Sequence, residues 1–185
     1  MSGGAVRWRR LDLPGHESAR LESADGAWRL AGAAVFTDEE GRLCRLCYHV
    51  DCDAAWRTTG ARVAGWVGGD AVDAAGDGGG EGRWRLNGRE CPQVEGCVDF
   101  DLSFSPSTNL LPIRRLRLDV GEEAGARAAW LRFPGFTLEP LEQVYRRTGE
   151  HAYRYGTVDG AFVRDLAVNA DGFVVRYPGL WEAAG

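Results

Sequence analysis

Two carboxylates near the middle of the chain have the spacing of a site that could do chemistry. In the run VDFDLSF, Asp99 and Asp101 alternate with Phe100 and Leu102. If this run is a strand, the two acidic residues share one face, with their Cα atoms about 6.5–7 Å apart. That separation suits the acid and base of a glycosidase, and it also suits a divalent cation held by both carboxylates. Two other interpretations stay open, namely a solvated strand face and ion pairs with neighbouring arginines.

A cationic segment follows these carboxylates. Residues 104–118 read FSPSTNLLPIRRLRL, in which a polar turn leads through apolar residues to three arginines. Interpreted as a turn and a strand, the segment places Arg115 on the face opposite to Arg114, which lies with the leucines. A hairpin with the preceding strand would let Arg115 pair with Asp99 or Asp101. Arg114 would then stay available to a ligand at the lip of a cavity.

The other residue types that carry chemistry form no pattern of a known site. The histidines are scattered, the serines lack a Gly-x-Ser-x-Gly elbow, and the absence of lysine excludes Schiff-base chemistry. Cys44 and Cys47, with Cys91 and Cys97, could suggest a zinc site. Residues three apart in a strand point to opposite faces, however, which favours packed thiols. We therefore expect no catalytic residue, no metal and no cofactor.

Aromatic residues are better candidates for a binding surface. The chain has seven tryptophans, most of which we assign to the core because of their size. In YRRTGEHAYRY, tyrosines alternate with arginines, and a guanidinium can stack on a ring and still hold an anion. We expect the mouth of a pocket among the tyrosines of this run, Tyr145, Tyr153 and Tyr155.

Composition bounds the class of protein. A chain of 185 residues has the usual size of a single domain, here 1–185, and can bury a sizeable core without disulfides. Its net charge of −5 argues against nucleic acid as a partner and against a polybasic membrane anchor. No apolar run approaches the roughly 20 residues of a transmembrane segment, and no secretory signal is visible. We expect a cytoplasmic protein, and the oligomeric state stays open.

Alternation with a period of two dominates the chain and predicts its elements. In LCRLCYHV, Cys44, Leu46, Tyr48 and Val50 share one face, and polar residues occupy most of the other. Acidic turns that end in glycine, TDEEG and NADG, separate strand-like runs. About ten short strands with frequent turns are typical of an antiparallel sandwich or barrel.

Three segments fit this scheme less directly. Residues 71–82, AVDAAGDGGGEG, predict a flexible loop. Residues 139–147 fit either a helix or a strand, and we favour the strand. Residues 105–109 predict a turn, in which Asn109 tolerates a left-handed backbone, and Pro112 then marks the start or the edge of a strand.

Several of these runs together resemble a family of bacterial glycolipid-binding proteins. The resemblance rests on VEGCVDFDLSFSPSTNLLPIRRLRL, on AAWLRFPGFTLEPLEQVYRR and on the ending YRYGTVDG…VNADGFVVRYPGLW. In addition, YHVDCDAAWRTT is similar to the family's Tyr-x-Val-x-Cys-Asp-x-x-Trp-x-Thr block. The resemblance covers Trp28 to Trp181 and implies an all-β, mainly antiparallel fold with little helix. It implies a curled sheet that forms an open or deformed barrel, similar to the sheets of bacterial lipoprotein carriers, with an apolar interior for an acyl chain.

The favoured hypothesis is therefore a protein that binds a lipid or glycolipid through an apolar lining and a polar rim. One alternative is an enzyme that acts on a carbohydrate or a lipid-linked sugar through Asp99 and Asp101, and another is a partner-binding structural module. The residues expected at the ligand's head group are Asn109, Arg114, Arg115 and Tyr145, followed by Trp56, Asp99 and Asp101.

Overall fold

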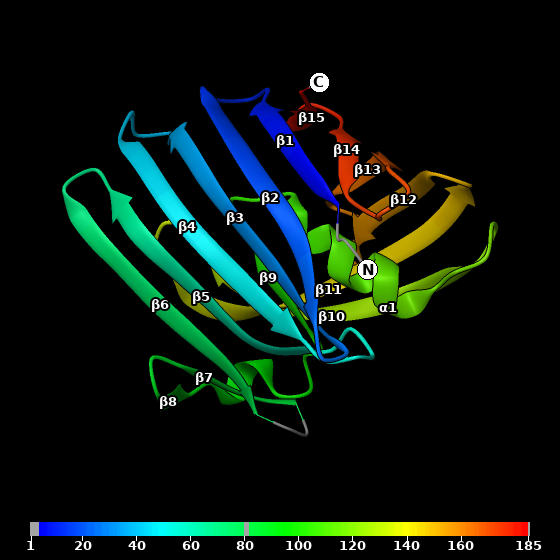
Figure 1. The fold of residues 1–185 in the computed structure, drawn as a ribbon, viewed down its shortest axis with the longest axis horizontal. Coiled ribbons are helices and arrows are strands. Elements are labelled where there is room, and N and C mark those ends of the chain that lie inside the picture. Colours follow the sequence, from blue (N-terminus) through cyan, green and yellow to red (C-terminus); the bar gives the residue numbers. More distant parts are fainter. Residues whose placement is uncertain (1–3, 80–81, 185) are drawn as a thin grey trace.

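The computed structural model describes residues 4–79 and 82–184, and these form one large sheet with very little helix (Figure 1). Fifteen strands in this part of the chain confirm the predicted all-β, mainly antiparallel class. None of the described helices is long and apolar enough to cross a membrane. The strands are β1 (Ala5–Arg10), β2 (Gly15–Ala24), β3 (Ala27–Thr37), β4 (Leu43–Cys52), β5 (Thr58–Val67), β6 (Asp70–Gly79), β7 (Arg83–Leu86), β8 (Arg89–Glu90), β9 (Asp99–Leu102), β10 (Glu123–Arg132), β11 (Thr137–Gly149), β12 (Ala152–Thr157), β13 (Val163–Val168), β14 (Val174–Tyr177) and β15 (Trp181–Ala183).

Strands that follow each other along the chain are mostly neighbours in the sheet. The order is β8-β7-β6-β5-β4-β3-β2-β1-β15-β14-β13-β12-β11-β10-β9. The described pairs are antiparallel except for β9 with β10, which run parallel. β1 pairs with β15 and so joins the N-terminal and C-terminal halves. Because β8 and β9 stand at opposite ends of this order, the sheet is curled but not closed into a barrel.

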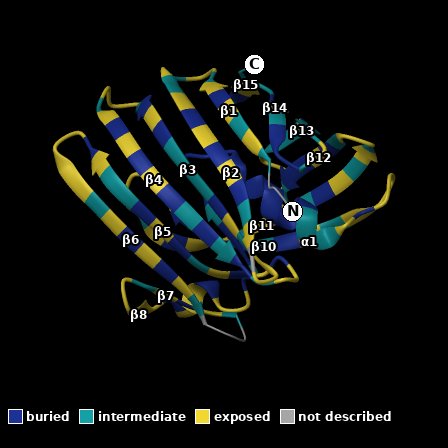
Figure 2. Ribbon diagram, viewed as in Figure 1, coloured by how far each residue is buried: buried dark blue, intermediate teal, exposed yellow. Residues whose placement is uncertain are grey.

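Alternating burial explains why these segments form strands. In β4, every second residue from Cys44 to Cys52 is buried, whereas Arg45 and Cys47 are exposed. Figure 2 shows the same alternation of buried and exposed residues along the neighbouring strands. One face of the sheet therefore packs on the core while the other meets solvent, as the period of two predicts. Cys44 and Cys47 lie on opposite faces, as expected for a strand.

The prediction of a turn and a strand for residues 104–118 is wrong. This segment contains the 3-10 helix η3 (Ser107–Asn109) and the α-helix α1 (Leu110–Leu116). Pro112 lies in the first turn of α1, where its missing N–H costs no hydrogen bond. Asn109 has a right-handed helical backbone, and the left-handed residue is Arg117, which ends α1. A further 3-10 helix, η2 (Pro92–Val94), precedes β9.

Residues 104–118, hereafter the covering segment, lie against the concave side of the sheet, and α1 is seen among the strands in Figure 1. The ring of Phe104 lies 6.3 Å from that of Phe36 on β3 and 6.0 Å from that of Tyr48 on β4, between centroids. Leu110 and Leu111 are fully buried in the same core. The apolar lining that the sequence assigned to an acyl chain therefore packs against the chain's own side chains, and an acyl chain could enter there only if α1 moved aside.

Two other ambiguous segments are strands. β6 takes up most of residues 71–82, so the predicted flexible loop is wrong there, and residues 80 and 81 lie outside the described part of the chain. β6 is bonded to β5 on one side and to β7 on the other, and these ladders hold a backbone that has few large side chains. Residues 139–147 belong to β11, which confirms the favoured interpretation of that segment.

Candidate functional site

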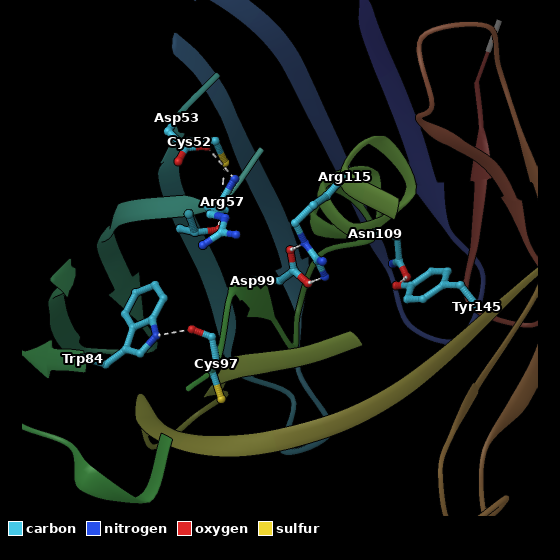
Figure 3. Close-up of polar contacts among 10 residues, drawn as sticks. Cys52, Asp53, Arg57, Trp84, Cys97, Asp99, Asn109, Arg115 and Tyr145 are labelled. Carbon is cyan, nitrogen blue, oxygen red and sulfur yellow. Dashed lines mark hydrogen bonds and ion pairs between the residues drawn. The ribbon is translucent and has the colours of Figure 1, made fainter. Parts of the chain in front are cut away.

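Arg115 of the covering segment forms an ion pair with the buried Asp99 of β9 (Figure 3). The Nε atom of Arg115 donates to Oδ1 of Asp99 at 3.0 Å, and its Nη2 atom donates to Oδ2 at 2.6 Å. Burial raises the pKa of Asp99, while the hydrogen bonds and the charge of Arg115 lower it. The predicted pairing of Arg115 with one of the two aspartates is confirmed, although Arg115 comes from α1 and not from a hairpin strand. Both oxygens of Asp99 are thereby engaged.

Asn109 and Tyr145 form a second internal contact of the covering segment (Figure 3). The Tyr145 hydroxyl donates to Oδ1 of Asn109 at 2.8 Å, and Nδ2 of Asn109 donates to the carbonyl oxygen of Pro106 at 3.2 Å. Both side chains are buried, and burial raises the pKa of Tyr145 well above its ordinary value. This pair therefore ties the start of the covering segment to β11.

Replacing Tyr145 by phenylalanine is expected to lower the free energy of unfolding by about 1–3 kcal/mol, because Oδ1 of Asn109 loses its donor in a buried place. Urea denaturation would measure the change. Tyr153→Phe on β12 is the control, since the Tyr153 hydroxyl makes no hydrogen bond within the described protein. Equal losses in the two variants would contradict a role for the Asn109–Tyr145 contact.

A cavity of about 280 Å³ opens beside the start of the covering segment. We call it the Asp101 cavity, after the carboxylate in its wall. Ser105 and Asn109 of the covering segment also border it, and the remaining wall comes largely from β10–β12, β14 and β15. The aromatic side chains in the wall are Trp130, Tyr155, Phe162, Tyr177 and Trp181.

Asp101 has fewer partners than Asp99. Its Oδ2 atom accepts a long hydrogen bond from Oγ1 of Thr108, at 3.4 Å. Burial raises the pKa of Asp101 to about 7, while hydrogen bonds from Thr108 and Gln143 lower it and the charge of Asp99 raises it further. A ligand that donated hydrogen bonds to this carboxylate would favour its ionised form.

The predicted head-group residues thus lie in three places, namely the Asp101 cavity, the contact between β9 and α1, and a second cavity that Trp56 and Arg114 border. Asp101 and Asn109 line the Asp101 cavity, and Tyr145 lies directly behind Asn109. The Asp99–Arg115 pair joins β9 to the covering segment. Of the tyrosines expected at the mouth of a pocket, Tyr155 lines this cavity and Tyr153 borders a different one.

Arg114 and Trp56 lie together, but at a different cavity. The guanidinium carbon of Arg114 is 5.3 Å from the centroid of the Trp56 ring, which itself stacks on Trp28 at 4.6 Å. Arg114 and Arg115 therefore have different partners, as the sequence predicted. The physical reason is a helix, in which consecutive side chains point about 100° apart, and not the alternation of a strand.

Sequence reasoning missed a buried carboxyl group on β2. Glu17 accepts hydrogen bonds from the hydroxyls of Tyr48 and Ser105 through Oε1, whereas its Oε2 atom is buried and has no partner among the described residues. Gly32 makes room for this contact, because a Cβ atom there would collide with the Tyr48 hydroxyl. Burial raises the pKa of Glu17 to about 7, against the hydrogen bonds from Ser105 and Tyr48 and the charge of Arg10. The signal was present, since Glu17 alternates in phase with the buried Ala19 and Leu21.

Comparison with known proteins identifies the family. A family model described as "Putative glycolipid-binding" matches residues 5–183. The chain belongs to this family. It is also similar to a crystal structure of a DUF1089 family protein from Pseudomonas aeruginosa, with a TM-score of 0.80 and 30% sequence identity over 90% of this chain and 91% of that chain. No curated protein matches. The family match includes every strand that borders the Asp101 cavity.

Proposed function

We propose that the protein binds a glycolipid and holds its sugar head group in the Asp101 cavity. The observation that carries this proposal is a carboxylate with few partners, set in a wall of aromatic rings. The family description names the same class of ligand. At about 280 Å³, the cavity lies near the lower limit of ordinary ligand sites, which suits a head group better than a whole lipid.

The two kinds of surface on a sugar match the two kinds of wall. Hydroxyl groups around the sugar ring can donate to Asp101, which has acceptor capacity to spare. The C–H faces of a sugar ring are apolar and pack on aromatic rings such as those of Tyr177 and Trp181. The amide of Asn109 adds a polar group to the cavity wall, although Tyr145 and Pro106 already occupy part of its hydrogen-bonding capacity.

An alkyl chain would leave the cavity past Trp130. Trp130 and Ser103 border both the Asp101 cavity and a second hollow of about 360 Å³. The walls of that hollow include the rings of Phe104 and Phe133, with charged side chains around them. Here a chain can pack on apolar surface without displacing α1, at about 25 cal/mol per Å² of area buried.

The contacts of Asp99 favour binding over the carbohydrate-acting enzyme. A glycosidase of the two-carboxylate kind needs both groups available to the substrate. Both oxygens of Asp99 accept hydrogen bonds from Arg115, so only Asp101 faces a cavity. We therefore develop the binding function alone.

Isothermal titration with alkyl hexosides tests this proposal. We expect an octyl hexoside to bind at least about tenfold more tightly than an octyl glycerol ether, which has the same chain but no sugar. Asp101→Asn should remove most of this preference, because a hydrogen bond to a charged acceptor contributes about 1.5–3 kcal/mol. In the unchanged protein, hexoside affinity should rise with pH through about 7, since the donors of the sugar favour the ionised carboxylate.

Asp165→Asn is the matched control, because this aspartate on β13 is exposed and lies outside the cavity wall. It should bind the hexoside as the unchanged protein does. A hexoside that binds no better than the glycerol ether, or an Asp101→Asn variant that keeps the full preference, would overturn the proposal.

A further inference from the structure

We propose that a second cavity, on the other side of the covering segment, binds a phosphate monoester. This cavity, hereafter the Arg114 cavity, has a volume of about 400 Å³. It lies between the end of α1, the turn from β11 to β12 and the loop from β13 to β14, with Trp56 as a further wall. The proposal is independent of sugar binding at Asp101, because the two cavities share no lining residue.

Arg114 is held in place by Trp56, but its Nε atom has no acceptor among the described residues. Its guanidinium lies over the Trp56 ring, and Trp56 is fixed in turn by its stack on Trp28 with an interplanar angle of 18°. The Nε atom of Arg114 is buried and has no hydrogen-bond partner within the described protein. Arg114 borders the cavity, so a ligand oxygen there would contact the terminal nitrogens of its guanidinium and not the buried Nε atom.

Two more arginines contribute charge to the same cavity. Arg117 is exposed at the end of α1, and Arg147 on β11 donates to the carbonyl oxygens of Leu118, Gly149 and Glu150. Those carbonyl contacts fix the position of Arg147 but do not neutralise its charge. Among the described residues, no carboxylate lies within ion-pair distance of any of the three cavity arginines.

The acidic residue in the lining lies at the rim. The Glu150 side chain is 85% exposed, and its Oε1 atom is 3.8 Å from Nε2 of His151, which also borders the cavity. Solvent screens its charge, so it offsets little of the positive potential inside. The cavity therefore has an excess of positive charge in a protein whose net charge is −5.

This arrangement suits a phosphate monoester. Such a group carries close to two negative charges at neutral pH and has three terminal oxygens, while arginine presents planar, paired donors. The ring of Tyr153 and the side chains of Ile113 and Leu118 give the cavity an apolar wall for the organic part of the ester. A soluble phosphate ester and the head group of a phosphatidic acid share this chemistry.

Binding assays with both sources test the inference. The probes are inorganic phosphate and glycerol phosphate in titration calorimetry, and phosphatidylcholine vesicles that contain phosphatidic acid or phosphatidylglycerol in co-sedimentation. We expect saturable binding of glycerol phosphate, of phosphatidic acid vesicles, or of both, and less binding of phosphatidylglycerol, a phosphate diester. Glycerol phosphate alone would indicate a soluble ligand, and phosphatidic acid alone a lipid.

Arg114→Gln and Arg117→Gln should each weaken this binding by at least about tenfold, because each removes a charge-assisted hydrogen bond. Arg117 is exposed, so its replacement tests the site even if Arg114→Gln lowers stability. Arg146→Gln, at an exposed position of β11 outside the cavity wall, should leave binding unchanged, and so should Asp101→Asn. Absence of saturable binding to every probe, or equal binding by the Arg114, Arg117 and Arg146 variants, would overturn the inference.

Discussion

Replacing Arg115 by methionine is expected to lower the free energy of unfolding by about 3–5 kcal/mol, the usual cost of removing one partner from a buried ion pair. The Asp99 side chain is 1% exposed and depends on Arg115 for hydrogen bonds to both of its oxygens. Methionine keeps much of the apolar stem but removes every donor. Asp99 would then have to take up a proton or remain as an uncompensated buried charge. Because taking up a proton becomes harder at higher pH, the stability that the variant loses relative to the unchanged protein should grow as the pH rises.

Urea denaturation of Arg115→Met beside Arg62→Met measures this effect against a matched pair. Arg62 and Asp73 also form an ion pair, at 2.8 Å, but their side chains are 53% and 62% exposed, and such pairs contribute at most about 1 kcal/mol. Adding Asp99→Asn to Arg115→Met should recover part of the loss, because it removes the stranded charge. Similar losses in the Arg115 and Arg62 variants would show that the buried pair does not anchor the covering segment.

Many of the strands, although not β6, could be predicted because each of them carries its own signal. In β4, burial follows the alternation of residue types one by one, and one face of the sheet is buried along its length. Such a signal needs no knowledge of the neighbouring strands. The alternation of residue types also gave the correct prediction for residues 139–147 of β11, for which a helix was the competing interpretation.

The covering segment could not be assigned from local pattern alone. Its α-helix spans only seven residues, too few for a period of 3.6 to be distinguished from the alternation in RRLRL. Pro112 fits the edge of a strand as well as the first turn of a helix. The conformation of this segment is decided by tertiary packing. The apolar concave face of the sheet must be covered, and the leucines of α1 cover it.

For the candidate sites too, some features could be predicted from the local sequence and others depend on the tertiary structure. That Arg114 and Arg115 have different partners could be predicted, because consecutive side chains diverge in strands and helices alike. That Asp101 faces aromatic rings of β12, β14 and β15 could not, because those strands are distant in sequence and meet it only through the curl of the sheet. β6 could not be predicted as a strand, because its alanines and glycines give no clear alternation of large apolar and polar residues.

Replacing Glu17 by glutamine is expected to make the protein more stable at pH values above about 7 and to have little effect near pH 5. The pKa of Glu17 is raised from 4.5 to about 7 in the folded protein, so the folded state holds a proton that the unfolded state has lost over this range. Stability therefore falls as the pH rises from 4.5 to about 7. A shift of this size corresponds to roughly 3 kcal/mol at full ionisation.

Glutamine stays neutral at every pH, and its amide oxygen can still accept from Tyr48 and Ser105, so the variant isolates the charge from the hydrogen bonds. Urea denaturation from about pH 5 to about pH 8 gives the difference between the two proteins. Glu22→Gln is the control on the same strand, since Glu22 is partly exposed and paired with Arg20. A stability difference for Glu17→Gln that stayed constant with pH, or that favoured the unchanged protein at high pH, would mean that Glu17 is ionised in the fold. The Oε2 atom, which accepts no hydrogen bond from the described residues, argues for the protonated form, because a buried ionised carboxylate needs hydrogen-bond donors at both oxygens.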